Sequence, residues 1–200
     1  MGNNSDHHSV NSSLPPPPPT PPIIVAMKGH PGTGKTTLAR SLASALRIPL
    51  IDKDDVRDSA VPNDLSYDVV WRVASTQLQL GLSVVVDSPL SRRAHLDRLI
   101  HVAGSAAGAR LLIVECRPSD EAVWRERLEQ RGSEEGASSH KPSTWRDLRK
   151  LIEGYRACHE YDAGGVPKLV VDTTSCTVEE LVEEVMDFIQ LHAPGIVKNI

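Results

Sequence analysis

The sequence predicts an α/β fold in which helices cover both faces of a five-stranded parallel sheet, a three-layer sandwich. Five short apolar runs alternate with helical stretches, and such alternation is the signature of this architecture. Each run is apolar along its whole length, which suits strands that are buried on both faces. The expected strands are 23–27, 48–52, 82–88, 110–116 and 168–174. The composition, 40% hydrophobic and 24% charged over 200 residues, is that of an ordinary globular domain.

The first 22 residues are polar and then proline-rich, and they cannot bury enough apolar area to join the core. We expect residues 1–22 to form a disordered or polyproline II tail, 23–193 to form the domain, and 194–200 to form a C-terminal tail. The PPPPP run is either a spacer or a site for a proline-reading partner.

The net charge of −4 argues against a stable nucleic acid complex, because domains that bind nucleic acid are usually basic. No two of the three cysteines form a C-x-x-C pair, so the sequence indicates neither a zinc site nor a disulfide framework. We expect reduced thiols in a cytoplasmic protein, with Cys116 buried. No apolar stretch approaches the roughly 18 residues of a membrane span.

The segment KGHPGTGKTT, residues 28–37, directly follows the first expected strand. It matches the phosphate-binding pattern G-x-x-x-x-G-K-[ST], and leucines every four residues from Leu38 to Leu46 predict the helix that this pattern requires. Glycines let backbone N–H groups converge on phosphate oxygens, to which the helix adds its positive end. The predicted nucleotide-binding residues are Gly29, His30, Pro31, Gly32, Thr33, Gly34, Lys35, Thr36 and Thr37.

The expected ligand of this loop is ATP with Mg²⁺. Lys35 would reach the β- and γ-phosphates as a catalytic residue, and the Thr36 hydroxyl would ligate the metal. Asp87, at the end of the run SVVVD, is the second candidate for the metal; the alternative is an aspartate that only forms the turn before Ser88-Pro89.

The segment DKDDVRD, residues 52–58, follows the second expected strand and holds the candidate general base. Asp54 and Arg57 are three residues apart and would point the same way from a first helical turn. They could orient an acceptor hydroxyl and bind an anionic group on the acceptor. The alternative is a solvated helix start, where acids are favoured.

Positive charge over the γ-phosphate could come from Arg127 and Arg131, four residues apart on one helix face. The alternative is that basic residues simply favour a helix C-terminus. The polar segment 131–144 follows, and it is either a lid or an unstructured insert. In the expected helix 63–80, Tyr67 and Trp71 either line an acceptor pocket or, as we favour, pack in the core.

These motifs resemble the small P-loop kinases of the polynucleotide-kinase, chloramphenicol-phosphotransferase and zeta-toxin group. GHPGTGKTTLAR is similar to the group's loop and helix, KDDVR to its base-bearing motif, and VVVDSPLSRR to its strand that ends in aspartate. The resemblance implies a sheet in the order 2-3-1-4-5, ATP-dependent transfer to a hydroxyl, Asp54 as base and Arg57 as acceptor ligand.

The expected function is therefore ATP- and Mg²⁺-dependent transfer of phosphate to a small hydroxylated acceptor. A nucleic acid 5′-hydroxyl is an alternative acceptor, although few aromatic residues are available to stack on bases. An ATPase or a nucleotide-dependent binding module is the alternative from another class.

Overall fold

The computed structural model describes residues 20–59, 61–106, 108–133, 140–155 and 158–196, and it confirms the predicted α/β sandwich. All strand pairs are parallel, and the order is β2-β3-β1-β4-β5, as the resemblance implies. The strands are β1 (Ile23–Lys28), β2 (Leu50–Asp52), β3 (Val84–Asp87), β4 (Arg110–Cys116) and β5 (Lys168–Val171).

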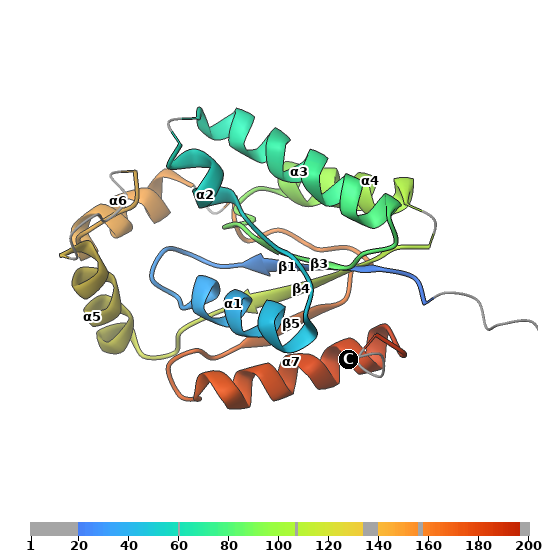
Figure 1. Cartoon of the computed structure of the whole chain (residues 1–200). Coiled ribbons are helices and arrows are strands. Elements are labelled where there is room, and N and C mark those ends of the chain that lie inside the picture. Colours follow the sequence, from blue (N-terminus) through green and yellow to red (C-terminus); the bar gives the residue numbers. More distant parts are fainter. Residues whose placement is uncertain (1–19, 60, 107, 134–139, 156–157, 197–200) are drawn as a thin grey trace, which may run out of the picture.

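Helices cover both faces of this sheet (Figure 1). The helices that cover these two faces are α1 (Lys35–Leu46), α3 (Asn63–Gln79), α4 (Arg93–Ser105) and α7 (Val178–His192). One core cluster joins α3 and α4 to the sheet, and a second joins α1 and α7 to its opposite face. All six residues of β1 are buried, as expected for a strand covered on both sides.

Three further helices lie near the carboxyl end of the sheet, toward which the β1 arrow points in Figure 1. They are α2 (Lys53–Arg57), α5 (Glu121–Gly132) and α6 (Trp145–Gly154). Parallel strands place their carboxyl ends at one edge, where ligands of open α/β sheets bind. The predicted site residues therefore collect at this edge.

Several strands are shorter than the sequence predicts. The second begins at Leu50 rather than Ile48, and the third spans Val84–Asp87 rather than 82–88. The fifth ends at Val171 because Asp172 turns away to accept hydrogen bonds from Ser119 and Thr174.

The core confirms two smaller expectations. Tyr67 and Trp71 are 6% and 4% exposed and pack in the core on the buried face of α3, so they do not line the acceptor pocket. Cys116 is buried. At the surface, Thr177 and Glu180 form a capping box at the start of α7.

The predicted lid, 131–144, begins inside α5 and ends one residue before α6. Its residues 134–139 lie outside the described part of the chain, as do residues 1–19 of the expected tail. Of the helices that the structure describes, none is both long and apolar enough to span a bilayer.

Candidate active site

The predicted phosphate-binding loop joins β1 to α1. Gly34 caps α1 with a φ of 80°, in the left-handed region that glycine adopts without strain. The first residue of the helix is Lys35, whose Nζ donates a hydrogen bond to the carbonyl of His30 at 3.1 Å. The strand, loop and helix thus have the arrangement that makes this pattern an anion site.

A cavity of about 590 Å³ lies over the start of α1 and is large enough for a nucleotide. From the loop it is lined by Gly32, Gly34, Lys35, Thr36 and Thr37. Arg127 closes another side, and its Nη1 donates to the carbonyl of Thr173 at 2.7 Å. We refer to this space as the nucleotide cavity.

The loop's other side faces away from this cavity. The His30 ring lies 4.4 Å from that of His159, and it lines a separate cavity of about 350 Å³. Burial, and then the neighbouring His159, lower the pKa of His30 to about 4. Trp124 of α5 donates from its indole Nε1 to the carbonyl of Pro31 at 2.9 Å. The structure thus places the side chain of His30 in packing contacts rather than against the nucleotide cavity.

Thr36 and Asp87 meet at the end of the sheet, as the metal prediction requires. The Thr36 hydroxyl donates to Asp87 Oδ2 at 2.6 Å. Asp52 lies beside Asp87 in the β2–β3 register and is buried with it. Burial, and then the charge of Asp87, raise the pKa of Asp52 to about 6. A hydroxyl with adjacent carboxylates is a donor set that fits Mg²⁺.

Within the described residues, no group of three or more His, Cys, Asp or Glu side chains could hold a metal ion by itself.

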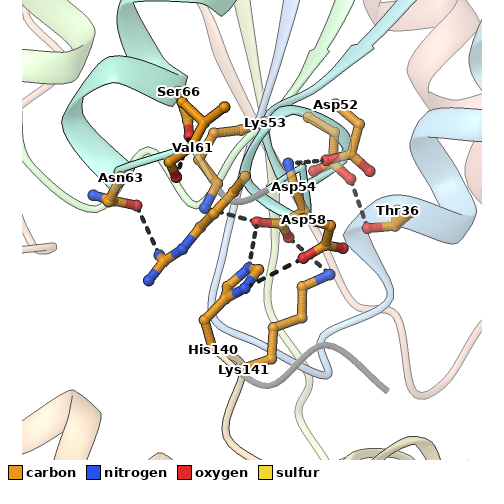
Figure 2. Close-up of polar contacts among 12 residues, drawn as sticks. Thr36, Asp52, Lys53, Asp54, Asp58, Val61, Asn63, Ser66, His140 and Lys141 are labelled. Carbon is orange, nitrogen blue, oxygen red and sulfur yellow. Dashed lines mark hydrogen bonds and ion pairs between the residues drawn. The ribbon is translucent and has the colours of Figure 1, made fainter. Parts of the chain in front are cut away.

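Asp54 lies on the first turn of α2, where Asp52 accepts a hydrogen bond from its backbone N–H at 2.8 Å. Two lysines and a histidine surround the carboxylate (Figure 2). Lys53 Nζ lies 2.7 Å from its Oδ1, and Lys141 Nζ lies 2.8 Å from its Oδ2. His140 Nε2 is 3.5 Å from Oδ1.

These contacts determine the protonation of Asp54. Burial alone would raise its pKa, but the hydrogen bonds from Lys141 and Lys53 outweigh burial and hold the pKa well below the usual range. The group is therefore ionised, as a general base must be, but its paired state makes it a weak proton acceptor.

A smaller cavity of about 130 Å³ brings predicted residues of the loop, α2, β3 and α5 together, and we call it the acceptor cavity. Its lining includes the predicted residues Lys35, Thr36, Asp54, Arg57, Asp87 and Arg131. Arg57 is held by a hydrogen bond from its Nη1 to Asn63 Oδ1 at 2.8 Å. The spacing argument that placed Asp54 and Arg57 on one side of α2 thus agrees with the geometry.

The two predicted arginines of α5 line the same nucleotide cavity, and Arg131 lines the acceptor cavity as well. Arg131 Nη2 donates to the carbonyl of Pro142 at 3.4 Å, which joins the two ends of the segment 131–144. The catalytic role of both arginines stays a prediction.

The sequence analysis did not identify Asp52, Lys53, His140 or Lys141 as site residues. Asp52 could have been found, because it ends an apolar strand as Asp87 does. His140 and Lys141 carry no such signal, since they lie in a polar segment far along the chain from Asp54.

Comparison with known proteins identifies the family and the fold. Residues 24–154 match the family model of the AAA domain. A curated protein of Methanocaldococcus jannaschii, named "Putative adenylate kinase", is 25% identical over 184 residues, which cover 83% of this chain and 85% of that protein. A cytidylate kinase of Pyrobaculum arsenaticum is 32% identical over 63 residues, 31% of this chain and 34% of that protein.

Solved structures show the same fold. A "putative kinase" from Chloroflexus aurantiacus superposes with a TM-score of 0.67 at 25% identity, over 84% of this chain and 98% of the other. A gluconokinase from Sinorhizobium meliloti gives a TM-score of 0.58 at 22% identity, over 90% and 98%. The expectation of a small P-loop kinase fold is confirmed, and the chain belongs to the AAA domain family of P-loop nucleotide-binding proteins.

Proposed function

We propose that this protein is an ATP- and Mg²⁺-dependent kinase that transfers the γ-phosphate to a hydroxyl group of a small acceptor. The observation that carries this proposal is the acceptor cavity, where Lys35 and Thr36 of the loop face Asp54 of α2. A phosphate-binding loop and a carboxylate base in one cavity would hold both reactants in position.

In this mechanism the loop N–H groups and Lys35 hold the triphosphate. Asp54 accepts the proton of the acceptor hydroxyl while the hydroxyl oxygen bonds to the γ-phosphorus. The bond from that phosphorus to the β–γ bridging oxygen breaks, and ADP leaves. Arg127 and Arg131 would stabilise the charge on the transferring group. Thr36 and Asp87 would hold Mg²⁺, which neutralises charge on the β- and γ-oxygens when it is bound.

The charges around the acceptor cavity suggest the class of acceptor. Lys53 and Arg57 of α2 line it, as does Lys141 from the segment before α6. Cationic side chains in a small cavity favour an acceptor that carries an anionic group beside its hydroxyl. We expect Arg57 to bind this group.

A second candidate is a nucleoside monophosphate kinase, which the names of the M. jannaschii and P. arsenaticum relatives favour. Its acceptor would be a phosphate oxygen, which is already deprotonated near neutral pH and needs no general base. The two candidates therefore make different demands on Asp54.

The experiment is transfer of labelled γ-phosphate from ATP with Mg²⁺ by wild type, Lys35→Ala and Asp54→Asn. The acceptors are, in separate reactions, hydroxylated metabolites with anionic groups, nucleoside monophosphates, and oligonucleotides with free 5′-hydroxyls. A product made by wild type and lost by about a thousandfold in both variants supports transfer to a hydroxyl with Asp54 as base.

The other outcomes are equally informative. A labelled nucleoside diphosphate that Asp54→Asn still makes identifies the second candidate. Label in an oligonucleotide identifies a 5′-hydroxyl kinase. Label released only as inorganic phosphate, at a rate indifferent to every acceptor, favours an ATPase and contradicts the proposal. ADP affinity, measured for Asp54→Asn, shows whether the variant keeps its fold.

A further inference from the structure

Lys141 stands where the nucleotide cavity and the acceptor cavity meet. The residues that line both cavities are Lys35, Thr36, Arg131 and Lys141. Lys35 and Thr36 belong to the phosphate-binding loop, and Arg131 was predicted to contact the transferring phosphate. Lys141 shares their location, but its charge is directed at Asp54, with Nζ 2.8 Å from Oδ2.

The two lysines on Asp54 differ in how firmly they are held. The Lys53 side chain is 5% exposed and lies over the Tyr67 ring at 5.7 Å, so its place is fixed by packing. Lys53 lines the acceptor cavity, where it pairs with Asp54 Oδ1, but it does not line the nucleotide cavity. The Lys141 side chain is 28% exposed and reaches both cavities, so it can change partner without a change in the core.

The pairing seen here opposes the role of Asp54 as base. A carboxylate with a lysine paired to each oxygen is a weak proton acceptor, because the two positive charges stabilise its ionised form. The terminal phosphate of a nucleoside triphosphate carries more negative charge than a carboxylate and would compete for Lys141. Removing Lys141 from Oδ2 would leave that oxygen open toward the acceptor cavity.

We propose that Lys141 exchanges its ion pair with Asp54 for contact with the terminal phosphate of a bound nucleoside triphosphate, and so releases Asp54 as the proton acceptor. The inference rests on the proposed function, since it takes Asp54 as base and the loop as the triphosphate site. ADP lacks the terminal phosphate, so the protein with ADP keeps Asp54 paired. Lys141 would then be a catalytic residue that contacts the transferring group.

The exchange predicts a coupling between Asp54 and Lys141 that only a triphosphate reveals, so the test needs no acceptor. Calorimetry measures the binding of ADP and of AMPPNP, both with Mg²⁺, to wild type, Asp54→Asn, Lys141→Ala and the double variant. Lys150→Ala, at an exposed position of α6, is the matched lysine control.

We expect Asp54→Asn to tighten AMPPNP binding by about tenfold, because Lys141 no longer has to leave a carboxylate. Lys141→Ala should weaken AMPPNP binding by about tenfold. In the Lys141→Ala background, Asp54→Asn should then change AMPPNP affinity by less than about threefold. ADP affinity should stay within about twofold in every variant, which also shows that each one folds.

Loss of negative charge alone could also tighten AMPPNP binding, and the double variant separates this effect. If Asp54→Asn tightens AMPPNP binding equally in the presence and in the absence of Lys141, the effect is simple charge repulsion. That result overturns the exchange. An unchanged ratio of AMPPNP to ADP affinity in all variants overturns it as well. If wild type binds neither ligand, the proposed function itself fails, and the exchange with it.

Discussion

The two halves of the candidate site are built in different ways. The nucleotide half is made of one short segment, residues 29–37, whose backbone is held between a strand and a helix. The acceptor half is made of side chains from α2 and from residues near 140, which are more than 80 positions apart. A contiguous site carries its geometry in local conformation, whereas a site of distant side chains depends on the tertiary fold.

The halves also differ in rigidity. The phosphate-binding loop is enclosed, since a Cβ added at Gly29 would lie 2.6 Å from the carbonyl oxygen of Cys116. A Cβ at Gly32 would lie 3.2 Å from Leu128 and Trp124 of α5. In contrast, Asp54 and Lys141 in the acceptor half are 20% and 28% exposed. The nucleotide half is thus fixed by packing, whereas Asp54 and Lys141 in the acceptor half have room to rearrange when ligands bind.

The largest effect should come from Gly29→Ala. Its φ of +143° and the contact with Cys116 leave no space for a methyl group, so the loop must move. We expect ADP affinity to fall by more than about a hundredfold and the free energy of unfolding to fall by about 2–4 kcal/mol. Calorimetry and urea unfolding measure the two quantities.

Gly81→Ala is the matched control, because Gly81 also has a positive φ, +78°, but a Cβ there would meet nothing within 4 Å. It should cost about 1–2 kcal/mol of stability from backbone strain alone, with ADP affinity unchanged. If both variants lose the same stability and both keep ADP affinity, the enclosure of the loop does not matter for binding.

A smaller effect, confined to the acceptor half, should come from Arg57→Ala. Arg57 lines the acceptor cavity and not the nucleotide cavity. Loss of a charge-assisted contact to an anionic acceptor should raise its KM by about ten- to a hundredfold, while ADP affinity stays within about twofold. Steady-state kinetics with the acceptor found in the transfer screen measure the first quantity.

Arg72→Ala provides the comparison for Arg57→Ala, since Arg72 is exposed on α3 and lines neither cavity. It should leave both the acceptor KM and ADP affinity unchanged. A parallel loss of acceptor and nucleotide binding in Arg57→Ala would show that the two halves are not separable.

The difference between the halves also explains what the sequence could predict. Alternating apolar runs predicted the layers and all five strands, because strands buried on both faces must be apolar throughout. The loop from Gly29 to Thr36 was predictable because its anion-binding geometry depends on consecutive residues. Thr36 and Asp87 were predictable as a pair, since Thr36 lies in the first turn of the helix that follows the loop after β1 and Asp87 ends the neighbouring strand β3.

The acceptor half was predictable only where one helical turn carries it. Asp54 and Arg57 satisfy a spacing rule, but His140 and Lys141 reach Asp54 only through the position of the segment between α5 and α6. No periodicity links residues so far apart. The direction of the His30 ring was not predictable either, because contacts with Trp124 of α5 and with Tyr155 at the end of α6, not the loop motif, determine which way the ring points.

The smallest effect concerns this histidine and the pH dependence of stability. The pKa of His30 is lowered to about 4, mainly by burial, from about 6.5 in the unfolded chain. The unfolded state therefore binds more protons than the folded state between these values, and stability must fall as the pH decreases from 6.5 to 4. In His30→Gln, the loss of unfolding free energy between pH 7 and pH 5 should be about 1 kcal/mol smaller than in wild type.

Urea unfolding at the two pH values measures this difference, with His101→Gln at an exposed position of α4 as the control. Part of the acid sensitivity should persist in His30→Gln, because burial also lowers the pKa of His95 to about 4. An unaltered pH dependence in His30→Gln would mean that the ring is solvated. The loop would then be less enclosed on that side than its contacts with α5 and α6 indicate, and the contrast between a fixed nucleotide half and an adjustable acceptor half would weaken.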